Sequence, residues 1–151
     1  MEGCFDYYKT SKAMTEDSYP YTGSKGSCKY SAANGVVQTT GYQYADSNGP
    51  VSMLEALKVQ PLTIGIAASS EEFNYYSSGI LSSKKCGTWL DHAVILIGYG
   101  QDSKGTLYWI IKNSWGTSWG EKGYGKILRD KTVGGAGICG VNQWVVYPTI
   151  A

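Results

Sequence analysis

The abundance of glycine and large aromatic residues sets the first limit on the architecture of this chain. Its 151 residues include 20 glycines, 13 tyrosines and 5 tryptophans. Glycine supplies turns, and tyrosine and tryptophan suit the pleated, half-buried surface of a strand. With 42% hydrophobic and 17% charged residues, a chain of this length can bury a core as one globular domain. We therefore expect a loop-rich, sheet-containing protein rather than an all-α protein.

Charge and hydropathy argue against two classes of partner. The formal net charge is +1 and both signs are scattered along the chain, so no basic surface for nucleic acid or anionic membrane is indicated. The longest apolar stretch, Ala93 to Gly98, is far shorter than the roughly 20 residues that span a bilayer. No basic leader precedes an apolar run near Met1, so no signal peptide is expected in this chain. We expect neither a nucleic-acid partner nor a membrane partner.

The four cysteines favour disulfide bonds over a metal site. Cys4, Cys28, Cys86 and Cys139 form no Cys-x-x-Cys pair, and the chain has a single histidine, so we expect no metal and no other cofactor. Spacing alone leaves all three pairings of four cysteines open. Disulfide use indicates an oxidising compartment.

The first half of the chain predicts short elements joined by a long loop. Residues 4–12 have helical spacing, but no cap residue precedes them, so this helix is expected to begin upstream. Residues 13–34 are rich in Ser, Thr, Gly, Asp and Pro and predict an ordered loop held by aromatic residues. Residues 36–44 predict a strand. Pro50 at a first helical position predicts a short amphipathic helix that ends before Pro61.

The second half predicts a sheet. Residues 62–67 read as a buried strand, and Ser69 with Glu72 reads as a capping box that begins a helix closed by Gly79. Three strands follow, at about residues 92–100, 106–112 and 123–129, separated by turns that contain glycine. No repeat or linker interrupts them, so we expect one antiparallel β unit surrounded by short helices.

His92 is the first candidate for a catalytic residue. It is the only histidine, and imidazole is the side chain that exchanges protons most readily near neutral pH. It follows Asp91 at the start of a predicted strand, where a rigid ladder can fix the ring while the rim leaves it accessible. The alternative is an ordinary surface or core histidine, which position alone favours.

Asn113 is the second candidate. It follows the apolar strand Tyr108 to Ile111 and precedes two tryptophans, Trp115 and Trp119. A carboxamide oxygen can accept the N–H of an imidazole and fix its tautomer, while indoles exclude water from that hydrogen bond. The alternative is a tight turn in which Asn113 and the glycines are structural and the indoles fill the core.

Several ordered motifs carry a family resemblance. They are Met1–Phe5, Tyr19-Pro20-Tyr21 ahead of Cys28-Lys29-Tyr30, Asp91-His92-Ala93 leading into Ile97-Gly98-Tyr99-Gly100, Lys112-Asn113-Ser114-Trp115-Gly116 with Trp119-Gly120 and Gly123-Tyr124, and Cys139-Gly140 with Tyr147-Pro148. Together they resemble the papain-like cysteine peptidases of the cathepsin L type. The resemblance implies an α+β fold in which residues 1–35 are a remnant of the helical domain with its interior loop. Residues 36–151 would form the antiparallel β-barrel-type domain that carries His92 and Asn113.

The resemblance also implies roles for the candidate residues. His92 would be the general base and the imidazolium partner of a thiolate, Asn113 its orienting residue and Trp115 the shield over their hydrogen bond, with Trp119 and Asp91 in support. Leu90, Ala93, Gly65 and Trp144 would line the pocket for the second side chain before the scissile bond. Gly65 opens its wall and Trp144 fills its floor, so a shallow pocket for modest apolar groups is expected.

The chain departs from the family in its nucleophile. The family's Cys-Gly-Ser/Ala-Cys-Trp/Tyr run lies about 130 to 150 residues before His and Asn. No such run occurs here, and Cys4 precedes His92 by only 88 positions (92 − 4). We therefore expect a C-terminal portion that lacks the nucleophile and is inactive alone. Cys4 as a substitute nucleophile, and Ser114 or Ser118 beside His92 in a serine hydrolase, are the alternatives.

The cysteines fit the same reading. By resemblance, Cys86 and Cys139 form the family's C-terminal disulfide, while the partner of Cys28 would lie in the absent segment, leaving Cys28 reduced, mispaired or joined to Cys4.

The resemblance implies a cysteine endopeptidase that acts on peptide or protein substrates, in a lysosome, a vacuole or outside the cell. The alternative is a non-catalytic papain-like module with a binding or structural role in an assembly. In either case, the absent N-terminal portion or another protein would cover an exposed half-core.

Overall fold

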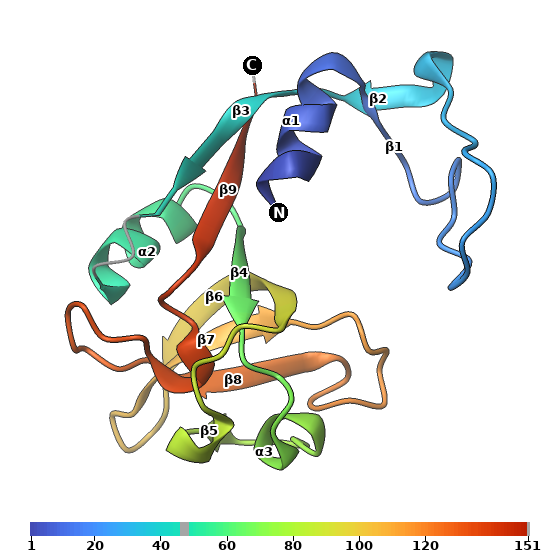
Figure 1. Cartoon of the computed structure of the whole chain (residues 1–151). Coiled ribbons are helices and arrows are strands. Elements are labelled where there is room, and N and C mark those ends of the chain that lie inside the picture. Colours follow the sequence, from blue (N-terminus) through green and yellow to red (C-terminus); the bar gives the residue numbers. More distant parts are fainter. Residues whose placement is uncertain (46–48, 151) are drawn as a thin grey trace. The chain divides into compact units, whose positions relative to one another are not determined.

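The computed structural model describes residues 1–45 and 49–150, which fall into two compact units (Figure 1). The first unit comprises Met1–Gln43 and Pro148–Ala151, and the second comprises Tyr44–Tyr147. The units group residues by their contacts with one another. The predicted boundary between residues 35 and 36 follows the two domains of the family fold instead, and it stays a prediction.

The first unit contains one helix and short strands. Helix α1 spans Glu2–Thr10, close to the predicted range, and Met1 gives it no side-chain cap. Thr39 Oγ1 donates to the Phe5 carbonyl at 2.7 Å and so ties β3 (Thr39–Tyr44) to this helix. The predicted loop at residues 13–34 contains β1 (Ala13–Met14) and a 3₁₀ turn, η1 (Ala32–Asn34). β1 pairs antiparallel with β2 (Gly35–Val37), and the strand predicted over residues 36–44 is divided between β2 and β3.

The loop between these strands is held by side chains, as predicted. The Tyr19 hydroxyl accepts from the Lys29 N–H at 3.1 Å, and the Glu16 carboxylate accepts from the Tyr21 N–H at 2.8 Å. The end of β9 lies beside β3, where Thr40 Oγ1 donates to Thr149 Oγ1 at 2.9 Å.

The second unit is built on a sheet in the order β9-β4-β6-β7-β8-β5 (Figure 1). The bounds are β4 Leu62–Ile66, β5 Ile80–Leu81, β6 His92–Gln101, β7 Leu107–Lys112, β8 Tyr124–Leu128 and β9 Val145–Ile150. Four of these correspond to predicted strands. β5 and β9 were not predicted, and β5 pairs with β8 in parallel, so this edge is an exception to the antiparallel unit that was expected.

Side chains on one face of β4 and β6 form the core of this unit. Leu62, Ile64 and Ile66 are fully buried on one face of β4, with Val94 and Leu96 from β6 on the same side. Trp109, Ile111 and Ile127 extend this face across β7 and β8. Successive side chains of a strand point to opposite faces, so the other face of β6 carries the exposed Ala93, Ile95 and Ile97.

Two α-helices and two 3₁₀ turns complete the unit. Helix α2 spans Pro50–Leu57, with Pro50 and Met53 buried, as predicted from the proline at its start. The turns are η2 (Lys84–Cys86) and η3 (Ile138–Gly140). No helix among the described residues is both long and apolar enough to cross a bilayer.

The predicted capping box at Ser69 was wrong. Helix α3 spans only Glu71–Asn74, and its cap is Ser70, whose hydroxyl accepts from the Phe73 N–H at 3.3 Å. The residue three positions after the cap is therefore Phe73, which is fully buried, and not Glu72. Burial of this ring sets the helical register, whereas a Ser–Glu pair at the surface adds little. Because α3 ends at Asn74, Gly79 belongs to a later turn.

Candidate active site

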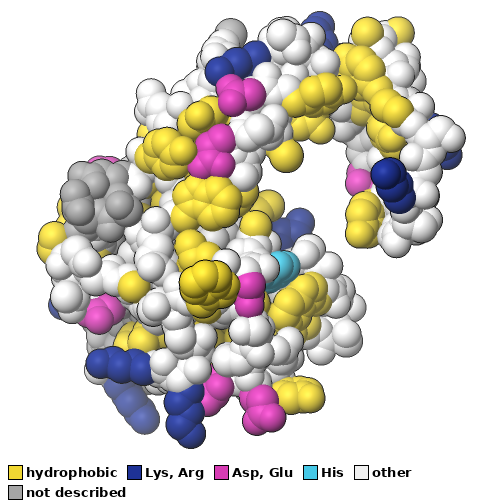
Figure 2. All heavy atoms as spheres, in the orientation of Figure 1, with side chains coloured by type: hydrophobic (Ala, Val, Ile, Leu, Met, Phe, Trp, Pro, Cys, Tyr) yellow, Lys and Arg dark blue, Asp and Glu magenta, His cyan; other side chains and the backbone are white. Residues whose placement is uncertain are grey.

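His92 is fixed at the entry of β6. It pairs with Ile66 in the antiparallel ladder, and the Asp91 N–H donates to the Ile66 carbonyl at 3.1 Å. The ring is half-buried and lines a shallow hollow with Trp115, Asp91 and Asn74. In Figure 2 the imidazole, coloured cyan, is visible at the surface beside hydrophobic side chains. The ladder therefore immobilises the backbone of His92 while its ring stays accessible.

Asn113 lies directly after β7 and is 7% exposed. Its N–H donates to the Gly123 carbonyl at 3.0 Å, which anchors the start of the following loop. The side-chain Oδ1 lies 2.9 Å from His92 Nε2 and 2.8 Å from the Ser114 backbone N–H. A backbone N–H can only donate, so the atom that it meets is the carboxamide oxygen. The pair predicted from the sequence is thus brought into hydrogen-bonding distance.

This hydrogen bond determines the tautomer of His92. An oxygen that accepts from Ser114 also accepts from the imidazole, so Nε2 carries the proton. In the neutral ring the lone pair is then on Nδ1. His92 can therefore accept a proton at Nδ1 while Nε2 stays bound to Asn113.

The two indoles have different positions. Trp115 is stacked on the imidazole, with ring centroids 5.0 Å apart and an interplanar angle of 26°. Trp119 is buried, and its Nε1–H donates to the Phe73 carbonyl at 2.9 Å. Phe73 meets Trp115 edge-on at 5.5 Å. Trp115 therefore covers the imidazole, and Trp119 and Phe73 support Trp115 from the core side.

Asp91 acts on the backbone around His92. Its carboxylate accepts from the Ala68 N–H at 2.7 Å, and this bond is the main reason that the pKa of Asp91 lies below its ordinary value. The carboxylate therefore stays ionised in mild acid. The hydrogen bond therefore fixes Asp91, the residue before His92, to the segment that follows β4.

The lowered pKa of Asp91 makes its contribution to stability pH-dependent. The ionised form stabilises the fold above the ordinary aspartate pKa of about 4, and this contribution is lost as the pH falls through the lowered value. Replacing Asp91 by asparagine keeps a neutral acceptor for Ala68 and is expected to cost less than about 1 kcal/mol at pH 6, because the group is exposed. Urea unfolding of both proteins should show the difference shrinking toward pH 2. A constant difference would contradict this account.

The four predicted pocket residues lie together. Gly65 and Ala93 are partners in the β4–β6 ladder, and the Gly65 N–H donates to the Trp144 carbonyl at 2.8 Å. A Cβ atom added at Gly65 would lie 3.0 Å from both the Leu90 Cδ1 and the Trp144 Cε3 atoms. Leu90 and Trp144 thus already fill the space above Gly65. Glycine is needed here for their close approach.

Comparisons with known proteins agree with this geometry. The sequence profile described as papain family cysteine protease matches residues 1–149. The chain belongs to the papain family of cysteine proteases. It is similar to fruit bromelain of Ananas comosus, at 44% identity over 136 residues that cover 90% of this chain and 38% of that protein. It is also 40% identical over 152 residues to the senescence-specific cysteine protease SAG12 of Arabidopsis thaliana, which covers 99% of this chain and 43% of that protein.

Solved papain-family structures share the fold. The bromelain protease from Ananas comosus in complex with the E64 inhibitor matches with a TM-score of 0.89 and 40% identity, covering 99% of this chain and 69% of that one. Digestive procathepsin L 3 of Tenebrio molitor matches with a TM-score of 0.89 and 32% identity, covering 99% and 48%. The predicted papain-like α+β fold is confirmed. The chain spans about two-fifths of the length of the curated relatives it matches.

The cysteines of this papain-family chain are divided between its two units. Cys86 and Cys139 form the predicted disulfide, with Cα atoms 5.0 Å apart, and it joins the turns η2 and η3. Cys4 and Cys28 are free and exposed, so the alternative of a bond between them is not realised. Both cysteines of the unit that carries His92 are therefore bonded. Among the described residues no group of three or more His, Cys, Asp or Glu side chains could hold a metal ion.

Sequence reasoning assigned no role at the site to Phe73, Tyr76 or Glu121. Phe73 contacts both indoles, and Tyr76 packs on Trp119 with ring centroids 5.3 Å apart. Phe73 and Tyr76 are 40 or more positions from the indoles that they contact, and Glu121 is 42 positions from Gly79, so no local pattern could have indicated these contacts. The only signal for Phe73 and Tyr76 was their place in the helix predicted between Ser69 and Gly79, which indicated no contact with the indoles.

Proposed function

We propose that this chain supplies the base, the orienting residue and part of the substrate cleft of a papain-like cysteine endopeptidase. The observation that carries the proposal is the hydrogen bond of 2.9 Å from His92 Nε2 to Asn113 Oδ1 beneath Trp115. A ring held in this way presents one nitrogen to solvent and keeps the other bound, as a base that must release its proton again requires.

The proposed mechanism uses Nδ1 of His92. It takes the proton of a cysteine thiol, which yields a thiolate and an imidazolium whose Nε2–H stays bonded to Asn113. The thiolate attacks the carbonyl carbon of a peptide bond, and the imidazolium protonates the departing amine. Water then hydrolyses the thioester, with His92 accepting the proton of water and returning it to the sulfur. Trp115 excludes solvent from the hydrogen bond throughout.

The thiol has to come from outside Tyr44–Tyr147, because both cysteines of this unit are in the disulfide. We propose that it belongs to a Cys-Gly-Ser/Ala-Cys-Trp/Tyr run of the kind described for the family, which the 151 residues do not contain. The 151-residue chain alone is then expected to be inactive. The serine hydrolase alternative gains no support, since among the described residues the His92 side chain is hydrogen-bonded to Asn113 and to neither Ser114 nor Ser118.

A thiol-reactive peptide-like probe tests this proposal. A form of the protein that includes the family's cysteine run is expected to be labelled, and His92→Ala is expected to abolish the labelling. The variant Cys4→Ser serves as the control and should be labelled like the parent. Labelling of the 151-residue chain that disappears in Cys4→Ser would instead identify Cys4 as the nucleophile.

The pocket residues are proposed to select the side chain that binds second before the scissile bond. Leu90 and Trp144 restrict the space above Gly65, so modest apolar groups are favoured. Leu90→Ala is expected to raise kcat/KM for a peptide with Phe at this position, relative to Val, by about tenfold, since removing methylenes changes discrimination by 1–3 kcal/mol. Assays with the two matched peptides measure the ratio, and an unchanged ratio would place this pocket elsewhere.

We propose that a further protein segment covers one face of the sheet. Ile95 is 42% exposed and lines a hollow with Ala93, Lys112 and Asn113. The Nδ2 amide of Asn113 is buried, and residues 1–45 and 49–150 offer it no hydrogen-bond partner. A buried donor without a partner costs about 1–3 kcal/mol, which favours an additional acceptor at this place. The N-terminal portion of the family fold, or another protein, is the proposed cover.

The expected compartment is lysosomal, vacuolar or extracellular. The disulfide Cys86–Cys139 supports this, because such bonds persist in oxidising compartments. The relatives named above are described as proteases, so the alternative of a non-catalytic binding or structural module is not favoured.

A further inference from the structure

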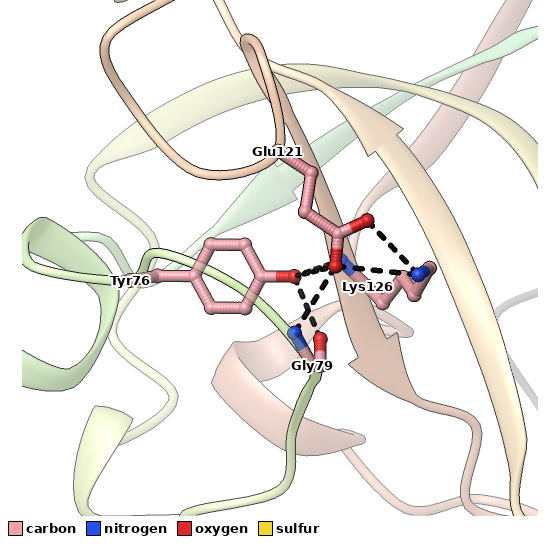
Figure 3. Close-up of polar contacts among 4 residues, drawn as sticks. All are labelled: Tyr76, Gly79, Glu121 and Lys126. Atoms are coloured by element: carbon pink, nitrogen blue, oxygen red, sulfur yellow. Dashed lines mark hydrogen bonds and ion pairs between the residues drawn. The ribbon is translucent and has the colours of Figure 1, made fainter.

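A polar cluster joins the loop that contains Trp119 and Glu121 to the turn at Gly79. It consists of the Tyr76 hydroxyl, the Gly79 backbone and the side chains of Glu121 and Lys126 (Figure 3). Glu121 Oε1 accepts from the Gly79 N–H at 3.0 Å, and its carboxylate forms an ion pair with Lys126 Nζ at 2.9 Å. The Tyr76 hydroxyl donates to the Gly79 carbonyl at 2.6 Å and accepts from the Lys126 N–H at 3.0 Å. The cluster thus ties the turn at Gly79 and the loop at Glu121 to β8.

Glu121 belongs to the loop that begins at Asn113. Asn113 donates to the Gly123 carbonyl and Glu121 donates to the Tyr124 carbonyl, so both ends of the loop are fixed to each other. The Trp119 carbonyl accepts from the Gly123 N–H at 2.7 Å. A displacement of Glu121 would therefore displace Trp119 and the indole-bearing part of the loop.

The segment that Glu121 holds is in direct contact with the indoles. The Tyr76 carbonyl accepts from the Gly120 N–H at 3.1 Å, and the Tyr76 ring packs on Trp119. A Cβ atom on Gly120 would lie 3.0 Å from the Tyr76 ring, and one on Gly125 would lie 2.8 Å from Trp119. No space remains between these groups, so they move together.

The contacts continue from Trp119 to the catalytic pair. Trp119 meets Trp115 edge-on, with ring centroids 5.9 Å apart, and Phe73 contacts both indoles. Trp115 in turn is stacked on His92. An unbroken series of packed rings therefore joins the polar cluster to the His92–Asn113 hydrogen bond.

The charge of Glu121 persists in mild acid. The hydrogen bond and ion pair with Lys126 are the main reason that the pKa of Glu121 lies below its ordinary value, and the Gly79 N–H adds to this. Protonation in the pH range of an acidic compartment is thereby opposed.

We propose that Glu121 is a positioning residue for the catalytic pair. Its carboxylate holds the loop that follows Asn113 against the segment from Phe73 to Gly79, and so keeps Trp115 over the hydrogen bond between His92 and Asn113. The consequence for peptide hydrolysis rests on the function proposed above, whereas the effect on the imidazole does not.

The single histidine makes a direct test possible in the 151-residue chain. Nitrogen-15 labelling of histidine gives one imidazole spin system, whose Nε2–H proton exchanges with water only when the hydrogen bond and the indole cover open. In Glu121→Ala this exchange is expected to accelerate by tenfold or more, with the Nδ1–H tautomer becoming detectable. In Glu121→Gln the change should be smaller, because a carboxamide oxygen still accepts from Gly79.

A matched control separates positioning from general destabilisation. Met53 is fully buried in α2, away from the ring series, and Met53→Ala should lower the melting temperature at least as much as Glu121→Ala. Its Nε2–H exchange at a temperature far below melting should stay at the parent rate. Exchange in Glu121→Ala that equals that of the parent or of Met53→Ala would overturn the proposal.

The same variants distinguish this proposal from the peptidase assignment. In a form that carries the family's cysteine run, Glu121→Ala is expected to lower kcat about tenfold with little change in KM, and Glu121→Gln should recover part of the loss. The imidazole measurement needs no catalysis, so it supports or overturns the role of Glu121 even if no peptidase activity is found. Probe labelling decides the peptidase assignment, whatever the imidazole of Glu121→Ala shows.

Discussion

Replacing His92 with alanine is expected to lower kcat/KM for peptide hydrolysis by roughly 10⁴-fold or more in a form of the protein that carries the family's cysteine run. The His92 imidazole has to activate the thiol and also to protonate the leaving amine, and these 151 residues contain no other histidine. Hydrolysis of a fluorogenic peptide, with the active sites titrated by an irreversible probe, measures the loss.

Two asparagines provide a graded control for this prediction. Asn113→Ala removes one hydrogen bond to a ring that becomes charged, which is worth about 1.5–3 kcal/mol or roughly 10- to 150-fold in rate. Asn142 is also buried, but its Nδ2 donates to the Gly135 carbonyl, so Asn142→Ala should reduce stability and leave kcat nearly unchanged. Equal losses of kcat in the two asparagine variants, or a His92→Ala protein with activity within tenfold of the parent, would refute the assignment.

Removing the disulfide Cys86–Cys139 is expected to lower the free energy of unfolding by about 4 kcal/mol. The two cysteines are 53 positions apart, and the constraint on the unfolded chain grows with the logarithm of that separation. Both cysteines are buried. The Cys139 carbonyl also accepts from the Ala67 N–H at 2.8 Å, directly after the end of β4. At about 2–4 °C per kcal/mol for a chain of this size, the melting temperature should fall by roughly 8–16 °C.

Denaturant unfolding of the double variant Cys86→Ala/Cys139→Ala measures this loss. The parent protein treated with a reductant should show a similar decrease, whereas Cys4→Ser/Cys28→Ser should match the parent, because those thiols are free. A double alanine variant within about 1 kcal/mol of the parent would mean that the native contacts, rather than the closed loop, supply the stability of this region.

The elements that the sequence predicted well are those set by local patterns. Short apolar runs marked β4 and β6, and a proline at the first helical position marked α2. Two neighbouring serines compete for the cap of α3, and the choice of Ser70 follows from the burial of Phe73. The two-residue strand β5 is too short for any pattern, and its parallel pairing with β8 is a long-range contact.

The candidate site likewise combines residues that the sequence indicated with contacts that only the structure revealed. The motifs identified His92, Asn113 and Trp115, and the resemblance paired Cys86 with Cys139, but spacing could not distinguish the roles of the two tryptophans. Trp115 covers the imidazole because its ring stacks there. Trp119 lies in the core, where its indole N–H donates to the Phe73 carbonyl, 46 positions away. The hydrogen bond from the Gly79 N–H to the Glu121 carboxylate joins residues 42 positions apart.

The sequence by itself determined the kinds of secondary structure, the absence of a nucleophile run from these 151 residues and the residue types available for proton transfer. These follow from backbone preferences and side-chain chemistry, which act over a few neighbouring residues. Only the tertiary structure decided that Nε2 of His92 faces Asn113, that Trp119 donates to the Phe73 carbonyl in the core and that the Glu121 carboxylate accepts from Gly79. Those outcomes depend on the packing of rings and backbone groups from distant segments, and no local pattern encodes which of them meet.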